Sequence, residues 1–138
     1  MKTRKNMYIT IIAILGLQSN SCDTRTDVAV IKNKLATNIL AVDQPNEIMT
    51  DSILYYGYNY LEKEEIESNQ SVTISVPGAG FQQATNNEKV YIYVFSEDSL
   101  VKYRKLTKYG GILKKSLIKK MDIQLNQIKY PLDTINIR

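Results

Sequence analysis

The stretch Lys89-Val90-Tyr91-Ile92-Tyr93-Val94-Phe95 is the most apolar run of the chain beyond its first 22 residues. In this stretch β-branched aliphatic residues alternate with aromatic ones, so that neither face of an extended segment would be polar. β-Branched and aromatic residues favour strands, and a strand that is apolar on both faces is typical of the centre of a domain. We therefore predict a central strand over residues 89–95 that is covered on both sides.

Shorter runs with strand character lie before this stretch and are separated by turn residues. Residues 71–76 alternate most clearly, with Val72, Ile74 and Val76 on one face and hydroxyl side chains on the other, which predicts a half-buried strand that ends at Pro77. Residues 52–60 are rich in aromatic and β-branched side chains, and we predict a strand there too. The full set of predicted strands is 28–32, 38–42, 52–60, 71–76 and 89–95, with 127–130 as a candidate last strand.

The C-terminal third shows helical signals. Asp98 or Ser99 could cap a helix that begins at Leu100 and ends near Lys108, before Gly110 and Gly111. Such a helix would place Leu100, Tyr103 and Leu106 on one face. Residues 112–121 fit either a helix or a strand followed by a short helix. We expect a mainly β domain over residues 28–138, an antiparallel β-sandwich-like fold with one or two short helices in its C-terminal third, and an α+β fold is the alternative.

The first 22 residues have the three-part order of a secretory signal. Basic residues at positions 2, 4 and 5 precede an uncharged stretch over residues 8–17, and small or polar residues then lead to Cys22. The uncharged stretch is about half the length of roughly 20 residues that a membrane-spanning helix needs. We therefore predict an export signal over residues 1–21 and a short tether over residues 22–27.

Cys22 is the single cysteine of the chain, so no disulfide can form within one molecule. Its position after the signal resembles that of the lipidated cysteine in bacterial lipoprotein precursors, with the small residue Ser21 before it and Ser19 where many such precursors have leucine. The resemblance implies a diacylglyceryl group on Cys22, and two acyl chains hold a protein firmly at a membrane. A secretory signal that leaves a free thiol and an uncleaved N-terminal anchor are the alternatives.

Part of the C-terminal region is similar to short lipoproteins of the Bacteroidota type. The residues that carry the similarity are Val94 to Leu100, Lys102, Tyr103, Ile112 to Lys115 and Leu125 to Pro131. Gln127 stands where such sequences often have a tryptophan. The resemblance implies a small β-rich lipoprotein with an inserted helix, a strand near residues 112–118 and a short helix near residues 119–125, and it implies no activity.

The same resemblance implies candidate modification sites, because such bacteria O-glycosylate exported proteins at Asp followed by Ser or Thr and an apolar residue. Three tripeptides fit that pattern, and their hydroxyl residues are Ser52, Ser99 and Thr134. Ser52 and Ser99 also have structural interpretations, as the start of a strand and as a helix cap.

Charge is distributed unevenly along the chain. Residues 23–98 hold five basic and 12 acidic side chains, whereas residues 99–138 hold ten basic and two acidic ones. Such asymmetry can indicate contact with nucleic acid or with a membrane, but an exported lipoprotein rarely meets nucleic acid. We expect no nucleic-acid partner, and either charge pairing within the molecule or a basic surface that faces lipid.

The composition argues against most enzyme chemistry. The chain has no histidine, which removes the commonest general base and the usual catalytic triads, and its single thiol is expected to be alkylated. The acidic run over residues 62–67 is more typical of a solvated turn than of a catalytic pair, and we expect no metal ion and no cofactor.

A binding role is the second hypothesis. Tyr56, Tyr58 and Tyr60 cluster around Gly57, and tyrosine side chains are enriched in recognition surfaces. We expect a lipid-anchored protein of the cell envelope, at the outer membrane, that acts as a structural or interaction module and has an envelope protein or glycan as its partner. The alternative is an envelope module that binds a glycan or small ligand through these tyrosines.

Overall fold

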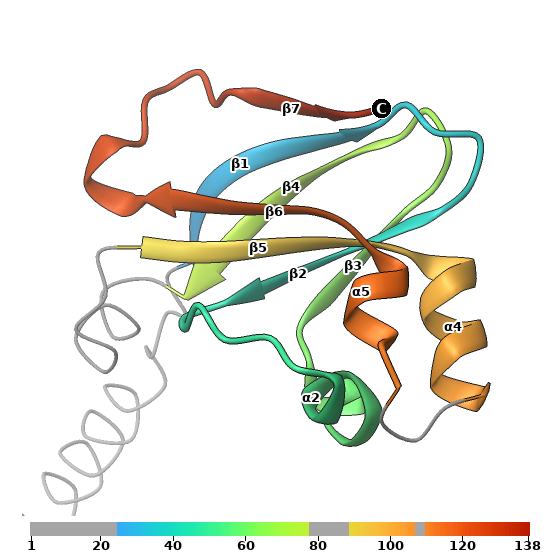
Figure 1. Ribbon diagram of the computed structural model, residues 1–138. Helices are drawn as coiled ribbons and strands as arrows, with labels where there is room; N and C mark the ends of the chain where they lie inside the picture. The colour runs from blue at the N-terminus through green and yellow to red at the C-terminus, as the bar shows by residue number, and fades with distance from the viewer. Residues whose placement is uncertain (1–24, 78–88, 107–109) are drawn as a thin grey trace, which may run out of the picture.

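The computed structural model describes residues 25–77, 89–106 and 110–138. These residues form a mainly β domain with two sheets and with helices on one side (Figure 1). The leader, Cys22 and Lys108, at which we predicted the helix to end, lie outside the described residues. The strands are β1 (Arg25–Asn33), β2 (Ile39–Gln44), β3 (Lys63–Ile66), β4 (Ser71–Pro77), β5 (Lys89–Ser96), β6 (Leu117–Gln124) and β7 (Thr134–Ile137). The helices are α2 (Asp51–Tyr56), α4 (Glu97–Leu106) and α5 (Ile112–Ser116), with short 3-10 turns η1 (Tyr58–Tyr60) and η2 (Leu125–Gln127).

The two sheets stack to form a sandwich. One sheet has the strand order β4-β1-β7 and the other has the order β3-β2-β5-β6. Neighbouring strands are antiparallel except β1 and β7, which are parallel. The predicted sandwich-like, mainly β fold is therefore confirmed, with one parallel pair in it.

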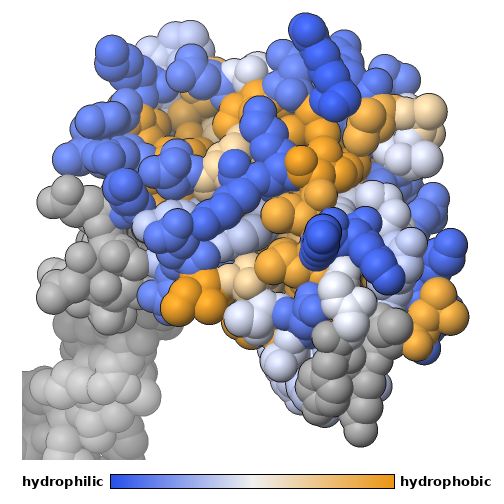
Figure 2. All heavy atoms as spheres, in the orientation of Figure 1, coloured by the Kyte–Doolittle hydropathy of each residue, from blue (hydrophilic) through white to orange (hydrophobic). Residues whose placement is uncertain are grey.

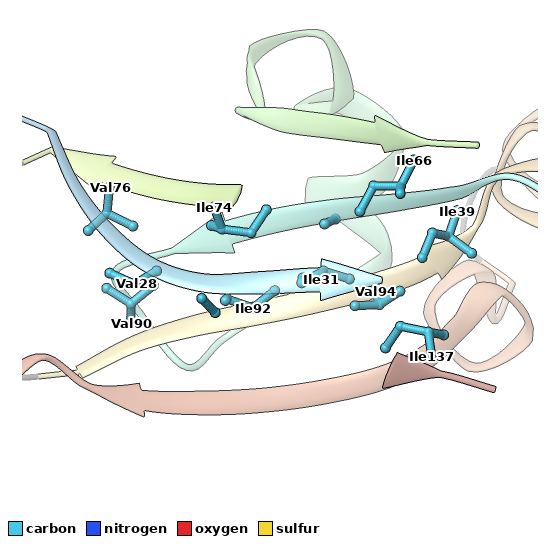
Figure 3. Close-up of a cluster of buried hydrophobic side chains, with 12 residues drawn as sticks. Val28, Ile31, Ile39, Ile66, Ile74, Val76, Val90, Ile92, Val94 and Ile137 are labelled. Carbon is cyan, nitrogen blue, oxygen red and sulfur yellow. The ribbon is translucent and has the colours of Figure 1, made fainter. Parts of the chain in front are cut away.

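The central position predicted for β5 is confirmed. Its aliphatic side chains Val90, Ile92 and Val94 are fully buried between the two sheets, where they meet side chains from β1, β2 and β4 (Figure 3). Tyr93 and Phe95 point to the opposite face of the same sheet and are buried in a second cluster. The alternation of aliphatic and aromatic residues thus matches two different apolar layers.

The second layer consists of the three helices. Leu54 of α2, Leu100 of α4 and Ile112 of α5 are fully buried against the face of the sheet that Phe95 occupies. The helices lie over one end of that face, and none of the described helices lies over the part that carries the start of β5 (Figure 1). The described residues therefore form three layers at one end and two at the other.

The strand predicted over residues 52–60 is wrong, because this segment forms α2 and η1. The Thr50 side chain caps α2 by accepting a hydrogen bond from the Ile53 amide at 3.2 Å, and Asp51 lies in the first turn, where the helix dipole favours an acid. Gly57 is the C-cap residue, and its amide donates a hydrogen bond to the Ile53 carbonyl oxygen at 2.8 Å. A Cβ at this residue would lie 2.9 Å from that oxygen, so a larger residue would be crowded there. These capping interactions and the burial of Leu54 outweigh the strand propensity of the tyrosines.

The C-terminal elements differ in several details from the predictions. Residues 112–121 form a helix and then a strand, α5 followed by β6, which is the reverse of the order implied by the resemblance. Residues 127–130 do not form a strand, and the last strand is β7. Helix α4 begins three residues earlier than predicted, and Leu106 is 65% exposed and so does not belong to its buried face.

The folded domain begins before the predicted residue 28. Arg25, Thr26 and Asp27 belong to β1 because they pair with β4 in register, Arg25 opposite Pro77. These three residues, which we assigned to a tether, are thus part of a strand.

Candidate functional site

The predicted tyrosine surface lies on α2 and η1. The ring of Tyr58 is enclosed by two cations: the Arg104 guanidinium carbon lies 3.8 Å from its centroid and the Lys63 ammonium lies 4.3 Å from it. Arg104 also donates hydrogen bonds to the carbonyl oxygens of Leu54 at 2.8 Å and Tyr55 at 3.4 Å, at the C-terminal end of α2. Tyr58 therefore helps to attach α2 to α4 and β3, which is a structural role.

Tyr56 and Tyr60 remain at the surface, with 56% and 89% of their area exposed. The Tyr56 ring packs edge to face against Tyr55, with centroids 4.8 Å apart. The structure therefore gives Tyr58 a different environment from Tyr56 and Tyr60, and the three do not form one uniform row along a strand.

A different tyrosine lies in a hollow that sequence reasoning did not single out. Tyr91 of β5 lines a cavity of about 300 Å³ on the part of the sheet face that the described helices do not cover. The charged side chains around it form two ion pairs, Lys120 with Glu47 at 2.8 Å and Lys89 with Asp122 at 3.2 Å. An aromatic ring surrounded by hydrogen-bond donors and acceptors is a suitable platform for a polar ligand.

Tyr93 and Lys120 make further contacts beside this hollow. The Tyr93 hydroxyl donates a hydrogen bond to the Glu47 carbonyl oxygen, and the Lys120 ammonium lies 5.7 Å from the Tyr93 ring centroid. Burial raises the pKa of Tyr93, while the hydrogen bond that Lys120 donates to the Glu47 carboxylate raises the pKa of Lys120. Both shifts favour the protonated form of the group.

A cavity of about 210 Å³ lies where β2, β3 and β4 meet. The acids that line it are Asp43, Glu62 and Glu64, and we call this group the acidic seam. Asp43 is opposite Ile92 in the pairing of β2 with β5, so its side chain points between the sheets. Burial, and next the neighbouring charge of Glu62, raise the pKa of Asp43 to about 6. Glu62 forms an ion pair with Arg25 at 2.5 Å. The seam thus holds a carboxyl group that titrates close to neutral pH.

A third hollow of about 270 Å³ lies beside β6 and β7. Figure 2 shows apolar side chains surrounded by hydrophilic ones in this region of the surface, between the two strands. The apolar residues that line the hollow are Val28, Ala29, Ile123, Ile128, Leu132 and Ile135.

The two outer strands of the four-stranded sheet carry opposite charges. β3 exposes Glu64 and Glu65, whereas β6 exposes Lys119 and Lys120. Because the strand order is β3-β2-β5-β6, these charges lie at opposite edges of the sheet. These acidic and basic side chains, which lie in different parts of the sequence, are therefore also separated in space.

The candidate modification residues occupy three different elements. Ser52 lies exposed in the first turn of α2, and Thr134 lies exposed at the start of β7. Ser99 is partly buried in the first turn of α4, where its amide donates to the Ser96 hydroxyl at 3.4 Å. Cys22, the candidate lipidation site, lies outside the described residues, and these three sites stay predictions.

No family model, curated protein or solved structure matches this chain. The described residues contain no group of three or more Asp, Glu or Cys side chains that could hold a metal ion. Within the same residues, no helix is both long and apolar enough to cross a membrane.

Sequence reasoning missed the Tyr91 hollow and the acidic seam for different reasons. The alternation in β5 predicted burial on both faces, but it does not show how far along the strand the helix layer extends. Asp43 follows an apolar run without a break, and this position at the end of a buried strand was an available signal for a partly buried carboxyl group.

Proposed function

We propose that the chain is a lipid-anchored protein of the cell envelope that acts as a structural or interaction module and not as an enzyme. The observation that carries the proposal is the order of the first 22 residues: basic residues, a short apolar stretch, small or polar residues, and then the single cysteine. A diacylglyceryl group on Cys22 would make a stable tether to the membrane.

The start of the folded domain supports a close attachment. β1 begins at Arg25, three residues after Cys22. Three extended residues span about 10 Å, so the lipid would hold the domain next to the head groups. Figure 1 shows the start of β1 at one end of the sandwich and helices α4 and α5 at the other. The lysines of those helices would then point away from the membrane, which favours a protein partner over lipid for that basic surface.

Composition supports a non-enzymatic role. A chain without histidine, whose only thiol is alkylated, would have to catalyse through carboxylates, hydroxyls or lysines alone. The exposed charged edges of the sheet instead suit contact with other macromolecules.

Intact-mass analysis of the full chain extracted from membranes tests the anchor. We expect the wild-type chain to begin at Cys22 and to carry the mass of a lipid, and Cys22→Ala to lose both the lipid and the membrane association. Ser19→Ala is the matched control, because it changes the leader by one hydroxyl and keeps the cysteine. An unmodified chain with a free thiol would contradict the proposal.

A second candidate function is the binding of a glycan or small polar ligand. The hollow at Tyr91 favours it, since one aromatic ring is surrounded there by Glu47, Lys89, Lys120 and Asp122. A panel of mono- and oligosaccharides, titrated by calorimetry against the full chain, tests this candidate. Tyr91→Ala is expected to abolish any binding found, because it removes the platform.

The predicted tyrosine surface supplies the matched comparison for that experiment. Tyr56→Ala and Tyr60→Ala remove exposed rings on α2 and η1 and leave the Tyr91 hollow intact. Loss of binding in these variants but not in Tyr91→Ala would place the ligand on the predicted surface instead.

A further inference from the structure

The four-stranded sheet has two open edges. In the order β3-β2-β5-β6, no described strand pairs with the outer side of β3 or of β6. An edge strand presents unpaired backbone N–H and C=O groups that can pair with another chain. The sheet can therefore be extended at both ends.

The two edges are complementary in charge. The exposed side chains of β3 include Glu64 and Glu65, and those of β6 include Lys119 and Lys120. Pairing of β6 with β6 would place lysines against lysines, and pairing of β3 with β3 would place glutamates against glutamates, and like charges opposite each other destabilise a sheet. Electrostatics therefore favours the pairing of β6 with β3.

The strand directions also suit that pairing. β3 is antiparallel to β2, β2 is antiparallel to β5, and β5 is antiparallel to β6. It follows that β3 and β6 run in opposite directions within one sheet. A second copy shifted sideways in the plane of the sheet, without being turned over, would therefore bring its β3 antiparallel to β6 of the first.

One register matches the charges on the helix side of the sheet. In the pairing of β3 with β2, Glu65 lies opposite Leu40 and Lys63 lies opposite Val42. In the pairing of β6 with β5, Asp122 lies opposite Tyr91 and Lys120 lies opposite Tyr93. The four partners belong to the cluster under the helices, so all four charged side chains are on the helix side. Antiparallel pairing that sets Lys120 against Glu65 also sets Asp122 against Lys63. A shift by two residues in either direction sets Lys120 against Lys63 or Asp122 against Glu65.

We propose that copies of this chain associate head to tail, with β6 of one copy paired to β3 of the next so that Lys120 faces Glu65 and Asp122 faces Lys63. Such a contact is heterologous and leaves a free edge at each end, so it builds an open array instead of a closed dimer. The inference rests on the interaction role proposed above, and it does not depend on the lipid.

The ion pairs that Lys120 and Asp122 form within one molecule do not prevent them from pairing with a second copy. Lys120 pairs with Glu47 at 2.8 Å and Asp122 pairs with Lys89 at 3.2 Å, and all four side chains are at least 37% exposed. Exposed ion pairs contribute about 0–1 kcal/mol each. The new partners across the contact can therefore replace them at little cost.

Sedimentation velocity of the full chain, purified in detergent, tests the proposal at low and high ionic strength. We expect association at low ionic strength that weakens as salt is added. The variants Lys119→Glu/Lys120→Glu and Glu64→Lys/Glu65→Lys are each expected to raise the apparent dissociation constant by about tenfold or more. All four substituted side chains are exposed, so both variants should stay folded and should unfold within a few degrees of the wild type.

Mixing the two variants gives the decisive result. The first variant keeps an acidic β3 and the second keeps a basic β6, and the two substituted edges are complementary to each other as well, so an equal mixture should associate in alternation at low ionic strength although neither variant does so alone. The control Lys102→Glu/Lys105→Glu makes the same change in net charge as the first variant, on exposed residues of α4, and should associate like the wild type.

A monomeric wild-type chain at low ionic strength, or a mixture that stays monomeric, would overturn the inference. So would a loss of association in the α4 control that equals the loss in the edge variants, because net charge alone would then explain it. A lipidated chain that is monomeric would overturn the head-to-tail contact and leave the anchor proposal intact. A self-associating chain with a free Cys22 thiol would overturn the anchor proposal and leave the head-to-tail contact intact.

Discussion

Asp43 lies partly buried between the two sheets, near Glu62 and Glu64. Burial, and then the charge of Glu62, raise its pKa from 3.8 to about 6. Because the folded state holds this proton more tightly than the unfolded chain, the folded state is favoured more strongly at low pH. The contribution of Asp43 to the free energy of unfolding is highest below about pH 4 and is lost as the pH rises through about 6.

Asp43→Asn should therefore stabilise the protein at pH 7 and have little effect near pH 4. We expect a gain of about 1–2 kcal/mol at pH 7, less than the full pKa shift implies because the carboxyl group is partly solvated. Urea unfolding at a series of pH values measures it. The exposed Asp133→Asn is the control and should leave the pH dependence unchanged. A wild-type stability that does not fall between about pH 4 and about pH 7 would contradict the prediction.

Asn33 is a fully buried polar residue whose side chain is satisfied by backbone groups. Its amide nitrogen donates to the carbonyl oxygens of Thr37 at 2.8 Å and Ile66 at 3.0 Å, and its side-chain oxygen accepts from the Leu35 amide at 2.9 Å. It therefore shapes the turn after β1 and links that turn to β3.

Asn33→Ala should lower the free energy of unfolding by about 2–4 kcal/mol, because one buried and two partly buried backbone groups lose their partner. Thermal unfolding followed by circular dichroism measures this loss. Asn38→Ala is the control, since the Asn38 side chain bonds only to the exposed Glu65 carboxylate at 3.2 Å, and its cost should stay below about 0.5 kcal/mol. Equal costs for the two variants would show that burial of Asn33 is not the cause.

At the scale of elements, Asp51 connects α2 to α5. Helix α5 begins after Gly111, which has a φ of 74° and offers no capping side chain. The Asp51 carboxylate replaces that cap, because it accepts hydrogen bonds from the amides of Gly111 and Leu113, both at 2.7 Å. A residue of one helix thus caps another that is 60 residues further along the chain.

Asp51→Ala should cost about 1–2 kcal/mol, the usual cost of a lost N-cap. The amides of Gly111 and Leu113 should also exchange with solvent faster, which hydrogen exchange followed by NMR detects. Ser52→Ala is the matched control, since Ser52 is exposed in the same helix and should change stability by less than about 0.5 kcal/mol. Unchanged exchange at Gly111 in Asp51→Ala would show that α5 does not depend on this cap.

The elements differ in how far the sequence predicts them. β4 was predictable because apolar and hydroxyl residues alternate along it, and β5 was predictable because it is a continuous run of β-branched and aromatic residues. α2 was not, since Ile53, Leu54 and the tyrosines favour a strand locally, and the helix depends on the Thr50 cap and on a sheet to pack against. β7 was missed because its four residues gain strand geometry only by pairing with β1.

The candidate sites follow the same division. The leader and Cys22 are local in sequence and could be predicted from it, and they remain predictions. The complementary edges need the strand order, because Glu65 and Lys120 become opposite margins of one sheet only when β2 and β5 lie between them. Sequence alone gave the charge imbalance but no means of placing it.

At the scale of the whole molecule, the two apolar clusters share their central strands. β5 contributes Ile92 to the cluster between the sheets and Phe95 to the cluster under the helices. β2 does the same with Ala41 and Leu40. If either cluster lost its packing, one face of β2 and β5 would be exposed, and the other cluster depends on the same two strands. The two layers should therefore unfold together.

This sharing predicts a single unfolding transition, even in a variant that damages only one layer. The chain has no tryptophan, so its ten tyrosines supply the intrinsic fluorescence, and Tyr91, Tyr93 and Tyr103 pack in the helix-side cluster. Far-ultraviolet circular dichroism reports mainly on the strands. Phe95→Ala should cost about 3–5 kcal/mol and lower the urea midpoint of both signals by the same amount. Ile92→Ala, on the other face of the same strand, should also shift the two midpoints together, by the cost of about 2–5 kcal/mol expected for a buried isoleucine. If Phe95→Ala lowered the fluorescence midpoint and left the circular dichroism midpoint in place, the helix layer would be a separate unit resting on an independently stable sandwich.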